Sequence, residues 1–396
     1  MYLFPGNWII RAERNVKSYE QFSNGRYFIF IFKFLCHYCI YIRFMMIKDI
    51  RLRSQQLAYP RFKTPLELVS WTGALQAQDY PMAKWATGMR LKVPSSVARR
   101  KVEEALSGGE LLRVHVMRPT WHLVPGEDIR WMVKLSARRI RRAGEAFGKD
   151  LEISEKLYLK CNRLMENMLS GHKSLTKQEM GAALENAGIA MSPARLSLFL
   201  MRAETDGILC SGPDKEGRFT YALLEERAPF AKDLPAEEAL AVLAARYFRS
   251  RSPAGLQDFV WWSGLSVTEA RQALESIRGK LVKERLPQGE VFIHDACCRE
   301  PVAEETVHFL PPFDEYLLGY KDRSAVLDAA HRPKAFNNWG IFYPVILHNG
   351  RIAGNWSRTA KKSGREDGPV FFEEGYRISS GAVQRAAERY REFSAG

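Results

Sequence analysis

The chain has 396 residues, of which 46% are hydrophobic and 26% are charged. This composition is that of a globular protein, and it excludes general disorder, a collagen-like chain and a multi-span membrane protein. The length is too great for one hydrophobic core and predicts two to four domains. The six cysteines are sparse and scattered, which excludes a disulfide-stapled secreted scaffold and favours the reducing cytoplasm.

The formal net charge of +14 is distributed unevenly along the chain. Residues 1–45 carry six basic and two acidic side chains, and residues 46–150 carry 20 basic and ten acidic ones. Residues 151–396 carry 33 of each sign and are therefore neutral overall. A basic block in an otherwise balanced protein indicates a polyanionic partner, nucleic acid before a membrane surface.

The apolar tract over residues 27–47 is long enough to span a bilayer, but three basic side chains interrupt it: Lys33, His37 and Arg43. No small-residue cleavage site follows, so a signal peptide is excluded. A natural start at Met45 or Met46 and a peripheral anchor remain as alternatives, and a membrane-spanning anchor is the weakest of the three. We expect a cytoplasmic, nucleoid-associated protein, and the functional prediction does not rest on residues 1–45.

The middle of the chain predicts a winged helix, a helix-turn-helix followed by a two-stranded hairpin. Thr176 is placed to cap a helix that Gly188 ends, and Ser192 is placed to cap the next helix. Two strand-like stretches separated by a Gly- and Pro-containing turn follow, over residues 208–210 and 219–223. Helix-turn-helix plus a wing is a DNA-binding arrangement.

The same order of elements is predicted twice more, before and after this segment. The expected fold is α+β, mainly α, with three tandem winged-helix domains and a small C-terminal β-barrel. The barrel is predicted from strand-like stretches around the Asn349-Gly350 hairpin turn. The domain bounds are 46–150, 151–230, 235–299 and 300–396, after the separate tract 1–45.

A Gln-x-Gln motif, Gln76-Ala77-Gln78, is the first candidate for chemistry. We expect a helix from Thr64-Pro65 through Leu75, so that the two amides and Asp79 lie at its end, where Pro81 forbids continuation. At a fraying helix end both amides can turn toward one cavity. On its own the motif is a weak signal, and a non-catalytic DNA-binding protein or transcription regulator is the alternative.

Three motifs together resemble the AlkZ-like superfamily of winged-helix DNA glycosylases. They are the Gln-x-Gln motif, the stretch Arg118-Pro119-Thr120-Trp121-His122-Leu123, and the stretch Leu310-Pro311-Pro312-Phe313-Asp314-Glu315-Tyr316. The resemblance covers about residues 50–380, and Gln78 places the chain on the branch with two glutamines. It implies three winged helices and a barrel around a basic channel, and hydrolysis of the bond between an alkylated purine and deoxyribose.

This chemistry suits the residues. A purine alkylated on a ring nitrogen carries a positive charge and leaves as a neutral base, so the enzyme needs only to position water and stabilise an oxocarbenium-like sugar. A glutamine amide can orient water, although it cannot act as a general base near neutral pH. We assign Gln76 and Gln78 to water positioning and sugar contact, without deciding which does which. Asp79 either stabilises the sugar cation or caps the next turn.

Thr120 and His122 are further site candidates, with a purely structural hydrogen-bonding role for His122 as the alternative. The helix predicted over about 127–147 carries six basic side chains without an intervening acid, and we favour contacts with DNA phosphates over a solvated face. These residues are Arg130, Lys134, Arg138, Arg139, Arg141 and Arg142. His348 and Arg351 flank the Asn-Gly turn, where they either probe a DNA groove or form an ordinary solvated turn.

The sequence therefore predicts a monofunctional DNA glycosylase for alkylated, cationic purines, including interstrand crosslinks, that acts on double-stranded DNA. We expect a monomer with no small-molecule cofactor and no metal, because the histidines are dispersed and Cys297-Cys298 lacks further ligands at suitable spacing. A regulator without catalysis, or a membrane-anchored form that depends on residues 1–45, are the other hypotheses.

Overall fold

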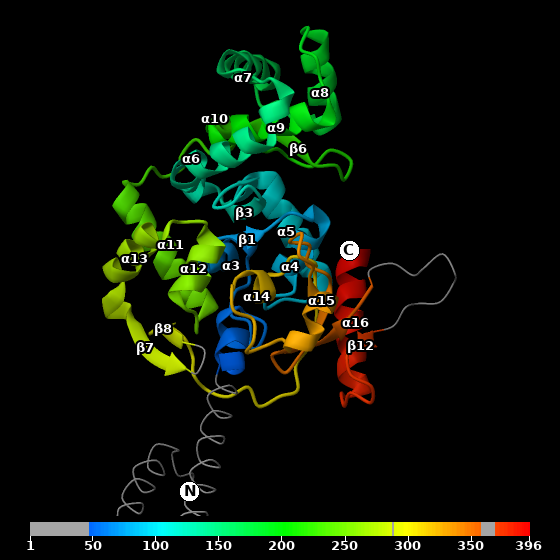
Figure 1. Ribbon diagram of the computed structural model, residues 1–396. Coiled ribbons are helices and arrows are strands. Elements are labelled where there is room, and N and C mark those ends of the chain that lie inside the picture. Colours follow the sequence, from blue (N-terminus) through cyan, green and yellow to red (C-terminus); the bar gives the residue numbers. More distant parts are fainter. Residues whose placement is uncertain (1–46, 287–288, 358–368) are drawn as a thin grey trace, which may run out of the picture. The chain divides into compact units, whose positions relative to one another are not determined.

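The computed structural model describes residues 47–286, 289–357 and 369–396. The predictions for residues 1–45 lie outside the described residues. The described residues form one compact unit of mixed helices and strands, in which helices predominate (Figure 1). Within the described ranges, no helix has both the length and the apolar character needed to cross a membrane.

The first segment after the helical stretch 47–54 has the order helix, strand, two helices and two strands. Its elements are α3 (Pro65–Thr72), β1 (Leu75–Gln76), α4 (Tyr80–Gly88), α5 (Ser95–Gly108), β2 (Leu111–His115) and β3 (Trp121–Pro125). The three strands form an antiparallel sheet in the order β1-β3-β2. The first strand, which contains Gln76, therefore pairs with the last strand of the segment.

The predicted helix through Leu75 is wrong at its C-terminal end. Thr64 caps α3 with a reciprocal Glu67 capping box, but the helix stops at Thr72 because Gly73 takes a positive φ of 83°. Pro81 likewise does not end a helix. It lies in the first turn of α4, where a missing backbone N–H leaves no helical hydrogen bond unmade. The Gln-x-Gln motif therefore begins in a strand and ends before a helix.

The second segment repeats this order; its helix-turn-helix and its two wing strands were predicted from the sequence, but its short first strand was not. It contains α7 (Glu155–Leu169), β4 (Leu175–Thr176), α8 (Lys177–Asn186), α9 (Pro193–Thr205), β5 (Leu209–Ser211) and β6 (Thr220–Leu223). Its sheet has the order β4-β6-β5. Thr176 forms a full capping box with Glu179, and Ser192 caps α9. The long helix α6 (Ile129–Phe147), with the short turn η1 (Gly126–Asp128) before it and η2 (Lys149–Leu151) after it, connects the two segments and packs against α9.

The third segment follows the short helix α10 (Leu224–Arg227). It comprises α11 (Ala236–Arg251), α12 (Leu256–Ser263), α13 (Val267–Ser276), the turn η3 (Arg278–Lys280), β7 (Leu281–Leu286) and β8 (Gly289–His294). An isolated bridge between Ala254 and Phe292 takes the place of the first strand of the other segments. The order of elements is thus kept a third time.

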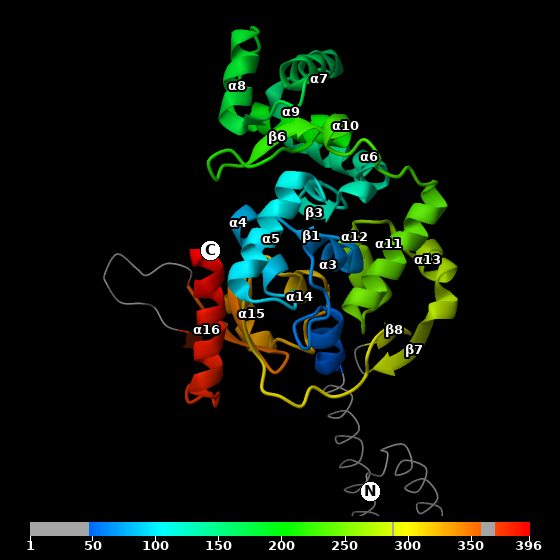
Figure 2. The same ribbon diagram turned by 180° about the vertical axis from the view of Figure 1, so that it is seen from behind.

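The C-terminal region forms a four-stranded antiparallel sheet in the order β12-β11-β10-β9. Its elements are β9 (Val307–Leu310), α14 (Glu315–Leu318), η4 (Ala329–His331), α15 (Arg332–Ala335), β10 (Val345–His348), β11 (Arg351–Asn355), β12 (Val370–Phe371) and α16 (Ser380–Ala395). Within the described residues the edge strands β9 and β12 do not pair with each other, so the sheet is open and the predicted closed barrel is not found. Both ribbon views show α16 beside α4 and α5, which it contacts (Figures 1 and 2).

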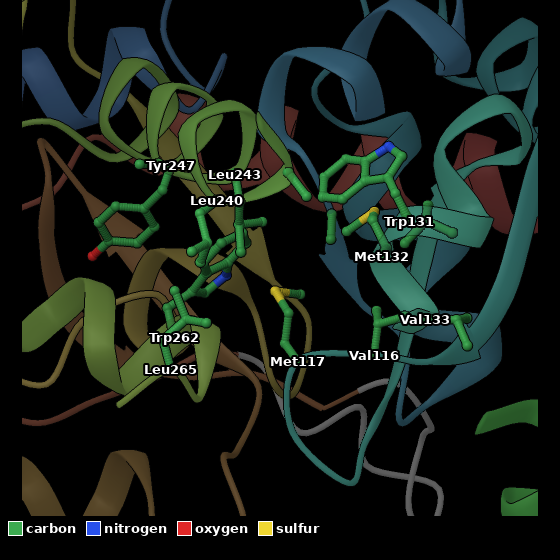
Figure 3. Close-up of a cluster of buried hydrophobic side chains, with 14 of the residues drawn as sticks. Val116, Met117, Trp131, Met132, Val133, Leu240, Leu243, Tyr247, Trp262 and Leu265 are labelled. Carbon is green, nitrogen blue, oxygen red and sulfur yellow. The ribbon is translucent and has the colours of Figure 1, made fainter. Parts of the chain in front are cut away.

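A hydrophobic cluster joins the first segment to the third and fixes their positions. Met117, in the turn between β2 and β3, lies between Trp131 and Met132 of α6 on one side and Leu243 of α11 and Trp262 of α12 on the other (Figure 3). All five side chains are at most 2% exposed. Burial of these apolar side chains packs the first and third segments firmly against each other.

Candidate active site

The backbone of the Gln-x-Gln motif is held by side chains from distant parts of the chain. The Gln76 amide donates to Glu315 Oε1 at 2.9 Å, and the Ala77 amide donates to the Trp121 carbonyl at 2.8 Å. Arg113 Nε donates to the Ala77 carbonyl at 2.9 Å. These three hydrogen bonds satisfy the Gln76 amide and both backbone polar groups of Ala77, and they hold this part of the motif in a defined conformation.

Glu315 is the centre of a buried polar network that also supports this strand. Its Oε2 accepts from Arg251 Nη2 at 2.7 Å and from Trp262 Nε1 at 3.0 Å. Arg251, in the last turn of α11, also donates to the carbonyls of Thr72 and Ala74 at 2.7 and 3.0 Å, on either side of Gly73. Side chains from the third segment and from the C-terminal region therefore hydrogen-bond to the backbone in and just before the strand that carries Gln76.

Gln76 and His122 lie opposite each other in the β1–β3 pair, so their side chains lie on the same face of the sheet. Gln76 is 6% exposed and His122 is fully buried. Among the described residues, neither Gln76 Oε1 nor His122 Nε2 has a hydrogen-bond partner. We call these two atoms the acceptor pair. Buried polar atoms are nearly always satisfied in folded proteins, so the acceptor pair is suited to a polar ligand or water.

His122 is held in one neutral form. Its Nδ1 lies 3.0 Å from the Thr120 carbonyl, to which the Nδ1–H donates, and Nε2 is left as an acceptor. Burial, with the positive charge of Arg118 as a further cause, holds the pKa of His122 well below its usual value. His122 is therefore an uncharged acceptor at neutral pH.

The two glutamines occupy different environments. Gln78 is exposed, whereas Gln76 is buried. Asp79 accepts a hydrogen bond from the Met82 amide at 3.2 Å and is the N-cap of α4. Of the two roles considered for Asp79, the structure shows the capping role.

Thr120 and Arg118 extend the site along the turn before β3. Thr120 Oγ1 and the Arg118 atoms Nε and Nη2 are buried and have no hydrogen-bond partner within the described residues. Arg118, Glu315 and Arg251 were not picked as site residues from the sequence. The two family-like stretches that contain Arg118 and Glu315 were a usable signal, but Arg251 had none.

The basic helix α6 meets acidic side chains from other parts of the chain. Arg130 pairs with Glu225, Lys134 with Asp233, Arg141 with Asp206, and Arg139 with Glu269 at 3.5 Å. Arg138 and Arg142 are exposed, and the structure shows no ion pair for either of them with a described residue. No acidic residue lies among these six cations in the sequence, but four of them pair with acidic side chains from elsewhere in the chain. The prediction of six cations free for DNA phosphates therefore overlooked these ion pairs.

A cavity of about 590 Å³ lies along this helix, and its basic lining residues are Lys134, Arg138, Arg139 and Arg142. The first turn of α11 and the N-cap residue of α13, Ser266, also line it. Helix N-termini and guanidinium groups both favour anions. This groove is the part of α6 best suited to a phosphate backbone.

His348 and Arg351 differ in their surroundings. His348 is 9% exposed, with Nδ1 2.9 Å from Tyr376 Oη and Nε2 3.0 Å from Glu305 Oε1. It ties the hairpin to neighbouring C-terminal residues and does not project into solvent. Arg351 is exposed at the hairpin turn. The buried position of His348 does not fit an ordinary solvated turn, and contact of either side chain with a DNA groove stays a prediction.

Within the described ranges, no group of three or more His, Cys, Asp or Glu side chains is arranged to hold a metal ion. The features that the described residues bring together at the Gln-x-Gln motif are amides, a neutral histidine, a hydroxyl and guanidinium groups. These groups can bind and orient polar ligands, and the acceptor pair can hold a hydrogen-bond donor between two oriented lone pairs.

The fold is that of a DNA glycosylase family. The chain belongs to the AlkZ-like DNA glycosylases, whose family model matches residues 69–393. It is similar to the interstrand DNA cross-link repair glycosylase of Streptomyces sahachiroi, with 23% identity over 319 residues that cover 76% of this chain and 85% of that protein. The solved structure of the DNA glycosylase AlkZ from the same organism shares the fold, with a TM-score of 0.70 and 20% identity over 89% of this chain and 96% of that chain. The resemblance predicted from the three motifs is confirmed.

Proposed function

We propose that this protein is a monofunctional DNA glycosylase that hydrolyses the N-glycosidic bond of alkylated, cationic purines, including those in interstrand crosslinks. The family supports glycosylase activity, and the name of the Streptomyces sahachiroi relative supports crosslinks as substrates. The observation that carries the proposal is the acceptor pair: Gln76 Oε1 and His122 Nε2 are buried, have no partner among the described residues, and belong to residues that lie opposite each other in the β1–β3 pair.

The three repeated segments support a DNA-binding scaffold. Each has the order of a winged helix, and the two complete sheets place the first strand against the last. We interpret residues 46–150, 151–230 and 235–299 as three winged helices. The C-terminal region adds an open sheet and the short helix α14, whose Glu315 accepts from the amide of Gln76 in β1.

In the proposed reaction, the bond from the sugar C1′ to the purine nitrogen breaks and the electron pair leaves with the base. The base was cationic because of its alkylated ring nitrogen, so it departs neutral and needs no general acid. A water molecule that donates one hydrogen bond to each atom of the acceptor pair keeps its lone pair free to attack C1′ of the oxocarbenium-like sugar. The new C1′–OH forms and one proton passes to solvent.

The structure supports a division of roles between the two glutamines. Buried Gln76 positions the water with neutral His122, whereas exposed Gln78 contacts the sugar or the DNA strand. Thr120 holds His122 in the acceptor tautomer through its carbonyl. Neither amide nor the histidine is basic enough to deprotonate water in advance, and the electrophilic sugar does not require it.

A base-release assay tests this function. The full chain is incubated with duplexes that carry a ring-nitrogen-methylated guanine, a ring-nitrogen-methylated adenine or a purine crosslink, and the released bases are identified by mass. Release from at least one substrate is expected. The alternative, a non-catalytic winged-helix regulator, predicts a sequence-specific footprint and no released base from any substrate.

The rate of base release is expected to show no inflection near the ordinary histidine pKa. Because the folded-state pKa of His122 is well below 6.5, the residue stays neutral when the pH falls from about 8 to about 6. A single-turnover rate profile over this range checks this prediction. A tenfold or larger loss centred near pH 6.5 would show that the site depends on a histidine with an unshifted pKa.

Reversing Arg138 and Arg142 to glutamate is expected to weaken DNA binding to all sequences alike and to lower the salt dependence. Each lost phosphate contact removes about 0.9 from the slope of log K against log salt concentration, so the double variant loses roughly 1.8. Fluorescence anisotropy at several salt concentrations measures this slope. Reversal of Lys160 and Arg163, two exposed cations of α7, is the charge-matched control. An equal effect of both double variants would reject a specific role for α6.

A further inference from the structure

Arg118 is a positively charged side chain with an unused hydrogen-bonding edge. Its Nε and Nη2 atoms, which together form the fork that matches two oxygens of one anion, are both buried and have no partner among the described residues. Burial lowers the pKa of Arg118, with the negative charge of Glu315 opposing this effect. A guanidinium group without a neutralising partner is costly to bury, so this edge needs an explanation.

Glu315 does not provide that partner. Its Oε1 accepts from the Gln76 amide, and its Oε2 accepts from Arg251 and Trp262. The carboxylate of Glu315 is therefore already paired with Arg251, which donates to it through both Nε and Nη2. Arg118 and Arg251 together carry one more positive charge than this carboxylate can balance.

A second buried guanidinium, that of Arg323, lies near Arg118: burial and the positive charge of Arg118 lower the pKa of Arg323, and the negative charge of Asp258 opposes this effect. Arg323 is 8% exposed, uses Nε and Nη1 for the carbonyls of Leu317 and Lys321, and has no partner for Nη2 within the described ranges. The guanidinium carbons of Arg118 and Arg323 lie 5.6 and 5.4 Å from the ring centre of Trp261, which is 39% exposed. Three elements far apart in the sequence thus place two cations around one partly exposed indole.

The position of Arg118 is built into the backbone. Met117 has a positive φ of 64°, and its amide donates to Ser136 Oγ at 2.8 Å. A Cβ at Gly264, the end of α12, would lie 2.6 Å from the Met117 carbonyl and 3.3 Å from Arg118 Cγ. The turn is therefore pressed against the end of α12, and a strained residue fixes the direction in which Arg118 leaves it.

We propose that the Nε–Nη2 edge of Arg118 binds a phosphodiester of the DNA strand next to the lesion nucleotide, with Arg323 adding positive potential and Thr120 Oγ1 donating from the same turn. This deepens the function proposed above and rests on DNA being the partner. A bound phosphate supplies two acceptor oxygens and one negative charge, which is the complement of the unused edge. It also offsets a cation that would otherwise repel the positively charged sugar.

The chemistry at Arg118 would suit any phosphate oxyanion, but its place favours DNA. Arg118 and Thr120 lie four and two residues before His122, so Arg118 is close in the chain to a member of the acceptor pair. A nucleotide whose C1′ faces the acceptor pair brings its own flanking phosphates to this neighbourhood. A free anion would require no such proximity.

The test uses the full chain and duplexes with a tetrahydrofuran abasic-site analogue, which cannot be cleaved. One flanking phosphate at a time is replaced by an uncharged methylphosphonate, and affinity is measured by anisotropy. Wild type is expected to lose about tenfold at one flanking position, the order of one charge-assisted contact. Arg118→Gln is expected to bind the unmodified and methylphosphonate duplexes equally well, whereas the matched control Arg163→Gln keeps the wild-type difference.

Because the methylphosphonate changes the DNA and not the protein, misfolding cannot imitate the wild-type result. Thermal unfolding of Arg118→Gln, and of Arg118→Lys, which keeps the charge without the fork, checks the variants. Wild type that is indifferent to every methylphosphonate, or Arg118→Gln that keeps the wild-type difference, would overturn the proposal. So would calorimetric binding of inorganic phosphate as tight as that of DNA. No base is released in this assay, so the phosphate site and the glycosylase activity can fail separately.

Discussion

Replacing Gln76 by alanine is expected to lower the single-turnover rate of base release by a factor of about 100 or more. The variant loses one atom of the acceptor pair, so water is no longer held between two oriented acceptors. Affinity for duplex containing an abasic-site analogue is expected to change by less than about threefold, because Gln76 is only 6% exposed and acts through a bound water in the proposed mechanism. Quenched-flow or manual sampling of released base, with anisotropy for affinity, separates the two quantities.

Two further variants make this result specific. Gln178→Ala removes an exposed amide on α8 and is expected to leave the rate unchanged. Gln78→Ala removes the exposed amide of the motif and is expected to weaken lesion binding as well as the rate, since this side chain contacts the substrate. A Gln76→Ala enzyme with the wild-type rate would remove the water-positioning role.

Truncation of Glu315 to alanine is expected to lower the free energy of unfolding by about 3–5 kcal/mol. The variant leaves the buried cation Arg251 without its carboxylate, and it leaves the Trp262 indole N–H and the Gln76 amide without their acceptor. Urea denaturation followed by circular dichroism measures this loss. Glu315→Gln, which keeps the shape and one acceptor oxygen, is expected to lose less.

An exposed ion pair provides the comparison. Glu104 lies 3.7 Å from Arg100 on α5, and both side chains are more than 60% exposed. Glu104→Ala is expected to change stability by less than about 1 kcal/mol, because exposed pairs contribute little. A Glu315→Ala protein as stable as Glu104→Ala would mean that the network around Glu315 does not hold the fold.

Elements with strong local signals were predictable from sequence. Thr176 and Ser192 are the N-caps of α8 and α9, and Asn349-Gly350 is a hairpin turn, all as predicted. These signals are short-range because a cap or a two-residue turn is satisfied by atoms a few residues away. Their positions therefore do not depend on how distant segments pack.

The elements that were missed depend on distant partners. β1 is two residues long and exists because β3, Arg251 and Glu315 satisfy the backbone of residues 72–77. The helix-like apolar pattern through Leu75 carried no information about these contacts. Closure of the C-terminal sheet failed as a prediction for the same reason, since strand-like stretches do not specify which edges pair.

The site was predictable in composition but not in arrangement. The Gln-x-Gln motif drew attention to Gln76, and the stretch 118–123 drew attention to His122. The sequence did not reveal the β1–β3 register that places these two residues opposite each other. The sequence showed the basic side chains of α6 correctly. Their acidic partners, however, lie 65 or more residues away in the chain: Glu225, Asp233, Asp206 and Glu269. A local charge count cannot include such partners.

The most direct test of the central claim, hydrolysis by a positioned water, is a single-turnover reaction of the full chain in ¹⁸O-enriched water with a duplex carrying a ring-nitrogen-methylated guanine. The account predicts free methylated guanine and an unbroken strand whose abasic sugar carries one ¹⁸O at C1′, with both products formed about 100 times more slowly by Gln76→Ala. The absence of free base from every alkylated or crosslinked duplex, or equal rates for wild type and Gln76→Ala, would contradict it.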